Sequence, residues 1–492
     1  MSRTRLVNPR PGWALSRERE ATPQKVTRLT IEAAIAANRF GLGARPGELA
    51  QAASDPRGWL KQQVRGTRPA PGVIETLPSA EDAFQEYTDA VRLRREMRQT
   101  DPTDPAKLVV QGVRKRLAPL YVRQVLARYQ VAVATPESFR ERLVHFWTNH
   151  FAVSADKPPV LVLAGTLENE AIRPNLAARF ADLLLAVESH PTMILYLDNQ
   201  ASIGPNSPLA QRVARRPGGS QRKLDINENL AREVLELHTL GVNSGYTQQD
   251  VTTFAQILTG WSVGAGRRTQ GRVGAFEFRD AAHEPGTKVL LGKRYAQSGG
   301  AQVRAVLDDL ARHPATAEHV ARKLVRHFVA DQPPAKAVAR IAKVFRDSDG
   351  SLPDVHAALV DLPEAWGARA SKYKTPHDFV VSAFRAIDSP PERSQQIIAA
   401  LRLLGQPAYR PGSPAGWPDT ASQWDGPGAL LERVEWAAQF GDRIGRRLAP
   451  TELAAQSLGA TLSDRTRSAI GRAASAAQAI TLWLLSPEFL RR

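Results

Sequence analysis

The stretch LDINENLAREVLELHTLGVNSGYTQQDVTTFAQILTGW, Leu224 to Trp261, carries the clearest fold signal in the chain. Its apolar residues recur at spacings of three and four, which predicts amphipathic helices. Asp225 followed by Glu228 is a capping pattern that predicts a helix start, and Thr247 followed by Asp250 repeats it. A glycine follows each periodic run, where glycine commonly ends a helix. The stretch therefore predicts a helical hairpin with a tight turn.

The same periodicity extends along most of the chain. Further helices are expected near residues 107–133, 137–151, 164–187, 301–312, 316–330, 335–347, 375–387, 393–404, 428–446 and 467–485, and those of the opening stretch near 226–240 and 248–259. Strand signals are few: the alternating runs AFEFR (Ala275 to Arg279) and TKVLL (Thr287 to Leu291) flank a Pro-Gly turn and predict one hairpin. We expect a mainly α protein, a large single helical domain with a small β-hairpin insertion.

The domain organisation is expected to be simple. Residues 1–27 are polar, basic and without period, which predicts a flexible tail. No long linker separates two apolar patterns after it, so residues 28–492 are interpreted as a single helical domain. Within this domain, residues 204–223 are rich in Pro, Gly, Ser and Arg and predict an exposed basic loop.

Composition bounds the class of function. The 492 residues are 42% apolar and 23% charged, as is typical of globular proteins. The formal net charge of +17 favours an anionic partner, although scattered arginines also arise in chains from GC-rich genomes. Nucleic acid is not expected as a partner, because aromatic and basic residues are not interleaved as a stacking platform requires. The absence of cysteine excludes disulfides, thiolate metal sites and cysteine nucleophiles.

The compartment is inferred from what the sequence lacks. No apolar run is long enough for a secretory signal at the start of the chain, or for a membrane span anywhere. We therefore expect a soluble protein with no membrane span, cytoplasmic by default.

The opening stretch also contains candidate chemistry. Asn229, Glu233 and Glu236 share one stripe of the predicted helix, whereas His238 lies within its apolar arc. One interpretation is structural: Arg232 bridges the glutamates four residues away on either side, and His238 is a hydrogen-bonded core histidine. The other is functional: Glu233 is a partly buried carboxylate with a raised pKa, able to act as acid, base or metal ligand.

A second candidate segment is TPESFRERLVHFWTNHFAVS, Thr135 to Ser154, which opens with a Thr-Pro capping pattern. On its helical wheel His150 projects from the centre of the apolar face, and His145 and Asn149 share the polar side. A buried histidine beside aromatic residues is either structural or catalytic, and both alternatives stay open. In either case a buried imidazole needs hydrogen-bond partners.

The predicted hairpin tip carries His283, Glu284 and Lys288, and loops of this kind often carry function. The chain contains none of the patterns HExxH, GxSxG, the Walker loop, or GxGxxG in a nucleotide-binding unit. The sequence therefore contains none of the common motifs that would assign it to the hydrolases, kinases or dehydrogenases.

Several segments, taken in order, resemble the bacterial family catalogued as domain of unknown function 1800. They are RFGLGARPGE (Arg39 to Glu48), LVHFWTNHF (Leu143 to Phe151), HPTMILYLDN (His190 to Asn199), NENLAREVLELHTLGV (Asn227 to Val242), YTQQDVTTFAQILTGW (Tyr246 to Trp261), FEFRDAAHEPGTKVLLG (Phe276 to Gly292), KYKTPHDFVVSAFRA (Lys372 to Ala386), GWP (Gly416 to Pro418) and SPEFLRR (Ser486 to Arg492). The family has no assigned function. The resemblance implies an exported helical protein, often encoded beside a family catalogued as domain of unknown function 1501 that is similar to sulfatase-type hydrolases. This chain departs from the family in lacking an export signal and in having His283-Glu284 where the usual pair is His-Asp.

Two hypotheses follow. The first is an enzyme that acts on a glycan or other anionic polymer through a His/Glu/Asn site, in which a divalent metal is an open alternative. Its expected catalytic residues are His150, Glu233 and His283, and its expected substrate-binding residues are Asn149, Asn229, Glu236, His238, Asp198, Asn199, Lys374 and Trp417. The second is a non-catalytic scaffold or accessory subunit, whose basic surface and 204–223 loop bind an anionic partner or a sulfatase-like protein of the 1501 family.

Overall fold

The computed structural model describes residues 30–100, 106–216, 225–265, 272–367, 370–445 and 448–492, with the side chains of 97–100 and 106–114 also outside the description. The predicted tail, residues 1–27, lies outside the described residues. The first helices are α1 (Ile31–Ile35), α2 (Glu48–Ala52), α3 (Pro56–Val64), α4 (Gly72–Glu75), α5 (Ala80–Thr100), α6 (Ala106–Ala134) and α7 (Ser138–His150). They are followed by α8 (Ala164–Thr166), α9 (Phe180–Glu188), α10 (Pro191–Tyr196), α11 (Pro208–Ala214), α12 (Asn229–Glu233) and α13 (Gln248–Leu258). The remaining helices are α14 (Gly300–Arg312), α15 (Pro314–Phe328), α16 (Ala335–Asp347), α17 (Leu352–Val360), α18 (Pro376–Ala386), α19 (Ser394–Leu403), α20 (Pro427–Ile444), α21 (Pro450–Leu458), α22 (Asp464–Gly471), α23 (Ala476–Leu484) and α24 (Pro487–Leu490).

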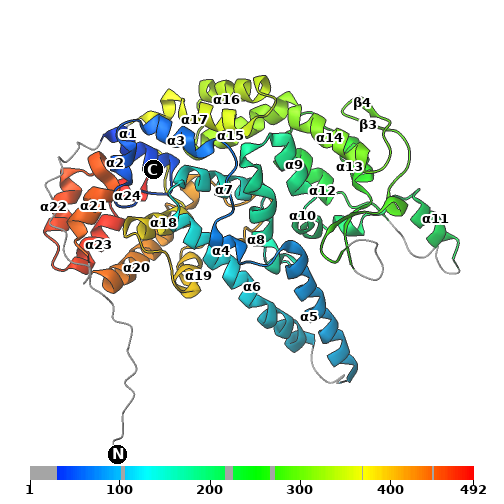
Figure 1. The fold of residues 1–492 in the computed structure, drawn as a ribbon, viewed down its shortest axis with the longest axis horizontal. Helices are drawn as coiled ribbons and strands as arrows, with labels where there is room; N and C mark the ends of the chain where they lie inside the picture. The colour runs from blue at the N-terminus through cyan, green and yellow to red at the C-terminus, as the bar shows by residue number, and fades with distance from the viewer. Residues whose placement is uncertain (1–29, 101–105, 217–224, 266–271, 368–369, 446–447) are drawn as a thin grey trace, which may run out of the picture.

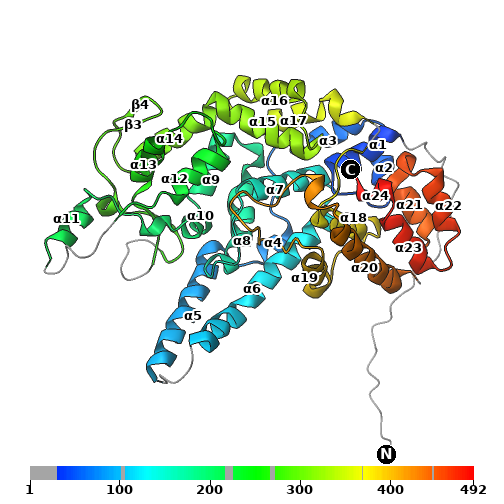
Figure 2. The same cartoon turned by 180° about the vertical axis from the view of Figure 1, so that it is seen from behind.

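The helices form an elongated arch (Figures 1 and 2). At one end α20 to α24 lie beside α1 and α2, so that the two ends of the described chain meet. At the other end lie α9 to α14 together with the strands, and α15 to α17 connect the two ends across the top. The expected fold class, mainly α with a small β insertion, is confirmed.

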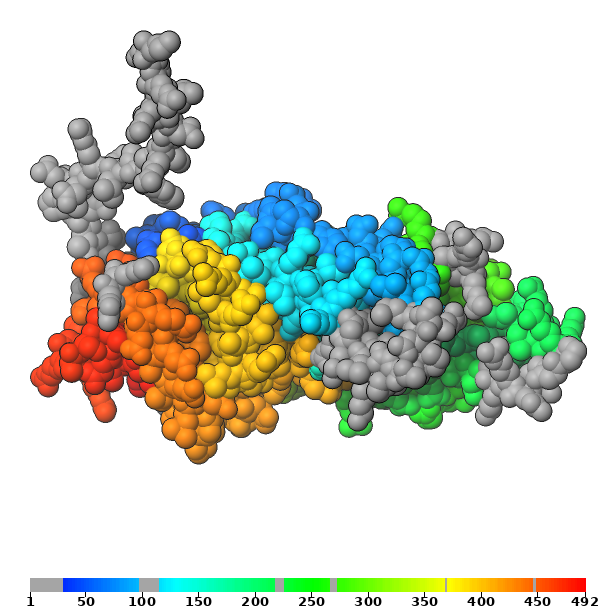
Figure 3. Space-filling view, turned by 90° about the horizontal axis from the view of Figure 1, so that it is seen from below, coloured from blue at the N-terminus to red at the C-terminus, as the bar shows by residue number. Residues whose placement is uncertain are grey.

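Helices α5 and α6 project from the middle of the arch as a long hairpin, and they cover the centre of the face seen in Figure 3. The periodicity predicts α6 well, but no individual helix was expected before residue 107. Helices α1 to α4 are short, which leaves few repeats of an apolar pattern to recognise. Helix α5 is longer and strongly charged.

Most of the core is one large cluster of buried apolar residues that runs from Ile35 to Leu490, with two small clusters beside it. Buried arginines tie distant segments together within it. Arg385 on α18 is fully buried; it donates to the Gly43 carbonyl at 2.7 Å and to both carboxylate oxygens of Glu48 at 2.7 and 2.9 Å. Its remaining donors bind carbonyls at the end of α6. The RFGLGARPGE segment is thereby fixed to α18 through charge-assisted hydrogen bonds.

The predicted strand pairing is wrong. The strands β1 (Trp261–Val263) and β2 (Phe276–Phe278) pair with each other, and β3 (Lys288–Leu290) pairs with β4 (Lys293–Tyr295). A short helical turn at Asp280–Ala282 separates β2 from β3. The β3–β4 turn has positive φ at both central residues, 50° at Leu291 and 75° at Gly292, which is the type I′ pattern of tight hairpins. Asp250 fixes this turn by accepting from the Leu291 amide at 2.9 Å, a long-range contact that no local pattern reveals.

Other boundaries also differ from expectation. The helix predicted over 226–240 begins at Asn229, so Asp225 does not cap it, and it continues as a π-helix over Val234–His238. The Thr247–Asp250 capping box and the packing of α12 on α13 are as predicted. The helices expected over 164–187 and 467–485 are each broken into shorter helices, and α7 begins at Ser138, after the Thr-Pro pattern.

The predicted loop over residues 204–223 contains a helix. Ser207 caps α11 by accepting from the Ala210 amide at 3.2 Å, and Pro208 occupies the first helical position. The arginines of this segment, Arg212, Arg215 and Arg216, are exposed as expected. Residues 217–223 lie outside the described residues.

Candidate functional site

Helix α7 passes through the middle of the arch and is buried over most of its length. Its positions 142, 145, 146 and 149 recur at helical spacing and face one cavity of about 330 Å³. Helices α6, α15 and α18 and the loop over residues 406–420 complete the wall. The polar residues that line the cavity are Arg128, Tyr129, Arg142, His145, Thr148, Asn149, His150, Lys323, Arg326, His327, Thr375, His377, Asp378, Gln406, Tyr409, Asp419 and Thr420.

Asn149 fixes the loop that forms one wall. Its side-chain amide donates to the Trp417 carbonyl at 2.9 Å and accepts from the Trp417 backbone amide at 2.8 Å. The loop approaches so closely that a Cβ at Gly416 would lie 2.4 Å from the Asn149 carbonyl oxygen, and Gly416 has a φ of +82°. Glycine is therefore required at this position, and Trp417 is held as an aromatic wall of the cavity.

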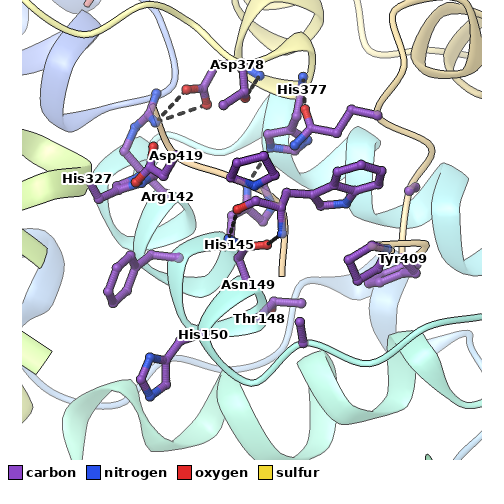
Figure 4. Close-up of a pocket in the computed structure, with 18 of the residues that line it drawn as sticks. Arg142, His145, Thr148, Asn149, His150, His327, His377, Asp378, Tyr409 and Asp419 are labelled. Atoms are coloured by element: carbon purple, nitrogen blue, oxygen red, sulfur yellow. Dashed lines mark hydrogen bonds and ion pairs between the residues drawn. The ribbon is translucent and has the colours of Figure 1, made fainter. Parts of the chain in front are cut away.

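A histidine–aspartate pair forms where the end of this loop meets α15 (Figure 4). The Nδ1 atom of His327 lies 2.7 Å from Oδ2 of Asp419. Burial lowers the pKa of His327 to about 4 against the opposing charge of Asp419. Burial alone would raise the pKa of the Asp419 carboxyl, but nearby His327 and Lys372 hold it well below its ordinary value. At neutral pH the imidazole is therefore neutral and donates from Nδ1 to the carboxylate, which leaves Nε2 as a base without a partner among the described residues.

Two cations on the same helix as His327 have no carboxylate within ion-pair distance among the described residues, although the charge of Asp419 acts on Lys323. Within the described part of the chain, neither Lys323 nor Arg326 forms an ion pair, and the buried Nε atom of Arg326 has no hydrogen-bond partner. Burial lowers the pKa of Lys323 to about 8, so that it is still mainly protonated at pH 7. The other two arginines of the lining are neutralised, since Arg128 lies 3.0 Å from Glu168 and Arg142 lies 3.0 Å from Asp378. The cavity consequently holds an excess of positive charge.

The wall nearest α6 contains a strained tyrosine. Tyr409 has a φ of +53°, a region that costs a non-glycine residue on the order of 1 to 3 kcal/mol. Its hydroxyl donates to Glu168 at 3.2 Å, and the guanidinium of Arg128 stacks over its ring at 4.7 Å. Thr148 donates to the same carboxylate at 2.9 Å. Strain of this kind persists where the surroundings hold it, and it is concentrated at functional sites.

The cavity brings together three of the residues expected from sequence: Asn149, His150 and Trp417. His150 is fully buried, and its Nε2 donates to the His238 carbonyl at 3.1 Å. Burial lowers the pKa of His150 well below its ordinary value, so this histidine is neutral.

Glu233 and His283, the other two expected catalytic residues, are not part of this lining. Burial raises the pKa of Glu233, the direction that the functional interpretation assumes. His283 is buried and donates from Nδ1 to the Thr259 carbonyl at 2.9 Å. The neighbouring Glu284 accepts from the backbone and side chain of Asn206 at 2.8 and 2.7 Å, and so fixes the segment that leads to α11.

The remaining expected substrate-binding residues, Asn229, Glu236, His238, Asp198, Asn199 and Lys374, also lie outside the lining. Most of them have intramolecular partners. Arg232 pairs with Glu228 and Glu236 at 3.1 and 3.4 Å, and His238 lies 2.8 Å from buried Glu188, which are the contacts that the structural interpretation describes. The amide of Asn199 binds two backbone carbonyls, and Lys157 lies 2.6 Å from Asp198. Lys374 is buried with its Nζ 4.0 Å from the centre of the Phe489 ring, and burial lowers its pKa to about 7.

Sequence reasoning missed the charged half of the cavity. Lys323, Arg326 and His327 have spacings of three and four on one predicted helix, but lysines and arginines in such a pattern usually face solvent. Asp419 directly follows the GWP segment, and His377 lies within the KYKTPHD segment, both quoted above. Only the folded chain places these three segments around one space.

Two negative findings complete the geometry. Over the ranges that the structure describes, no group of three or more His, Asp or Glu side chains is placed to hold a metal ion. None of the described helices is both long and apolar enough to cross a membrane.

Comparison with known families places the cavity in context. The family model described as "Protein of unknown function (DUF1800)" matches residues 35–491. The chain belongs to the DUF1800 family. Searches among curated proteins and among solved structures give no match. The match spans α7, α15, α18 and the 406–420 loop, so every wall of the cavity lies within the family region.

Proposed function

We propose that the cavity beneath the 406–420 loop binds a small organic anion, such as the acidic end of a glycan, and that His327 acts on it as an acid or base. The observation that carries this proposal is the placement of Lys323 and Arg326, which are half-buried and form no ion pair within the described chain, beside a neutral histidine held by Asp419. Removing cations from water without an ion-pair partner costs free energy, and a bound anion would offset that cost.

The size of the cavity narrows the ligand class. Its volume of about 330 Å³ lies at the lower end of the range of small-molecule sites, about 300 to 1,000 Å³. A single sugar unit or the end of a chain fits this size better than a polymer that crosses the protein. Trp417 offers an aromatic face to such a ring, and the cations offer charge-assisted hydrogen bonds to a carboxylate, sulfate or phosphate group.

Calorimetric titration with sulfate, phosphate and glucuronate tests the binding step. We expect Lys323→Gln and Arg326→Gln each to weaken binding roughly ten- to hundredfold, since a hydrogen bond to a charged group contributes about 1.5 to 3 kcal/mol. Arg322→Gln is the matched control, because Arg322 lies on the same helix but is exposed and paired with Glu318 at 3.0 Å. Binding that is absent, or that falls equally in the control, would contradict the proposal.

Turnover separates an enzyme from a binding protein. Oligosaccharides that end in a uronic acid are incubated with wild type and with His327→Gln, and the products are followed by mass spectrometry. If the protein is an enzyme that uses His327, we expect products from wild type alone, while the His327→Gln variant still binds glucuronate. Binding without products from either protein would leave the cavity as a binding site only.

The scaffold hypothesis has support from a different surface. Helix α11 and the residues after it expose Arg212, Arg215 and Arg216. Such a segment suits an anionic polymer or an acidic face of a sulfatase-like protein of the 1501 family. Replacement of the three arginines by glutamine should abolish capture of that partner while leaving glucuronate binding in the cavity unchanged; unaltered capture would count against the scaffold.

A further inference from the structure

Three cavity-lining side chains from three different helices form a continuous series of contacts, of which Figure 4 labels His145 and His377. The hydroxyl of Tyr129 on α6 lies 2.7 Å from Nδ1 of His377 on α18. The Nε2 of His377 lies 2.9 Å from Nδ1 of His145 on α7. The other nitrogen of His145, Nε2, lies 3.4 Å from Oε1 of Glu141, one turn earlier on α7.

Glu141 sets the direction in which the hydrogen bonds of this series of contacts are donated. Burial would raise the pKa of its carboxyl, but Arg173, which donates to both oxygens at 2.5 and 2.8 Å, holds it far below the ordinary value. Nε2 of His145 lies within ion-pair distance of Glu141 but makes no hydrogen bond in this geometry. The negative charge of Glu141 favours the tautomer that carries the proton on this nearer nitrogen, so that Nδ1 of His145 accepts from His377. The proton of His377 is then on Nε2, and its Nδ1 accepts from the Tyr129 hydroxyl. Burial lowers the pKa of both histidines, which keeps them neutral.

The two ends of this series of contacts, Tyr129 and Glu141, face two different cavities. Tyr129, His377 and His145 line the cavity described above, whereas Glu141 and Arg173 line a second cavity of about 450 Å³. The histidine pair therefore stands in the wall between the two cavities. A carboxylate that ends such a chain stabilises an imidazolium next to it.

We propose that Tyr129, His377 and His145 form a proton relay that takes a proton from the ligand of the first cavity and stores it on His145 beside Glu141. The ligand's proton moves to the Tyr129 oxygen, the tyrosine proton moves to Nδ1 of His377, and the Nε2 proton of His377 moves to Nδ1 of His145. The ligand ends with one proton fewer and His145 with one more, as an imidazolium paired with the Glu141 carboxylate. Reversal returns the proton, so that the relay and His327 supply two acid–base groups to one ligand. This inference rests on the proposed function, because the ligand is the proton donor.

Nitrogen-15 NMR of histidine-labelled protein tests the direction of the relay. At pH 7 we expect both His145 and His377 to carry their proton on Nε2. Tyr129→Phe, which removes only a hydroxyl, should shift the Nδ1 signal of His377 and leave both tautomers unchanged. Glu141→Gln can donate as well as accept, so it should give a mixture of His145 tautomers; Glu137→Gln is the matched control, since Glu137 lines the second cavity but pairs with Arg68 at 2.8 Å. A proton on Nδ1 of either wild-type histidine would overturn the relay.

Dihydrogen phosphate at pH 6 tests the transfer itself. With phosphate bound, the ring protons of His145 and His377 should exchange faster in wild type than in Tyr129→Phe, as measured by NMR line broadening, although both proteins bind phosphate. Equal exchange rates in the two proteins would overturn the relay while leaving the proposed function intact. If the histidines show the predicted tautomers but the protein does not bind phosphate, the proposed function would be overturned instead, and the relay would lose its proton donor.

Discussion

Asn149 and Trp417, 268 positions apart in the sequence, exchange two hydrogen bonds, one in each direction, and this exchange holds the 406–420 loop against α7. The contact is between a side-chain amide and the backbone, so it fixes the path of the loop rather than only the indole ring. The shape of the cavity therefore depends on how closely the loop can approach Asn149.

Gly416→Ala should destabilise the protein. The added Cβ would lie 2.4 Å from the Asn149 carbonyl oxygen, and alanine is disfavoured at a φ of +82°. We expect a loss of about 1 to 3 kcal/mol in the free energy of unfolding, measured by urea denaturation. Gly412→Ala, in the same loop with nothing within 4 Å of its Cβ, is the control and should change little. Equal stability of the two variants would show that the close approach does not matter.

Stability should fall as the pH is lowered from 7 to 5. Burial lowers the pKa of His319 and His327 to about 4 and that of His356 to about 3, whereas in the unfolded chain histidine titrates near its ordinary value of 6.5. Below pH 6.5 the unfolded state therefore binds more protons, and each histidine costs about 2 kcal/mol by pH 5. Urea denaturation across this range measures the effect.

His356 offers a specific check on that pH dependence. Its Nε2 accepts from the Trp147 indole at 3.2 Å, a bond that protonation would break. His356→Gln should lose some stability at pH 7 but show a shallower decline toward pH 5. A slope identical to that of wild type would mean that His356 does not titrate differently in the folded and unfolded states.

Arg385→Met should be among the most destabilising single changes. It leaves buried Glu48 without its partner, and breaking a buried ion pair from one side costs about 3 to 5 kcal/mol. Arg340→Met is the control, because Arg340 is half exposed where it pairs with Glu364, and such pairs contribute about 0 to 1 kcal/mol. Thermal denaturation of both variants separates the two cases, and a comparable decrease in both would contradict the assignment.

His283→Ala separates the cavity from the residues expected at the hairpin tip. In the wild-type protein, the contact of the His283 Nδ1 with Thr259 and the adjoining contacts between Glu284 and Asn206 anchor the segment before α11. We expect faster proteolysis near residues 204–216, with glucuronate affinity within about twofold of wild type. Loss of affinity in a variant that remains folded would place His283 in the binding site instead.

Much of the fold follows from local pattern. The capping box at Thr247, the hairpin of α12 and α13, and the long periodic helices all express rules that act within a few turns. The strand pairing did not follow, because the β3–β4 turn is held by Asp250, 41 positions away in sequence from Leu291. The break of α12 into a π-helix likewise leaves no mark on its apolar spacing.

The candidate site could be predicted from the sequence only in part, because the fold brings together residues that are far apart in the chain. Asn149 and His150 were recognisable because polar groups interrupt an otherwise apolar helix. Lys323 and Arg326 resemble ordinary surface charges until the fold turns them toward α7, and Asp419 acquires its role only from contact with His327. Glu233 and His283 are buried or half-buried polar groups as well, and sequence does not distinguish a residue that lines a cavity from one that holds a segment in place.

Diffraction from crystals soaked in selenate, recorded at the selenium absorption edge, tests the central claim most directly, because selenate has the charge and shape of sulfate. We predict an anomalous peak inside the cavity, within hydrogen-bonding reach of Lys323 and Arg326, that disappears in the Lys323→Gln, Arg326→Gln double variant. Selenate found only on the outer surface, or a cavity peak that persists in the double variant, would contradict the anion site from which the proposed function is derived.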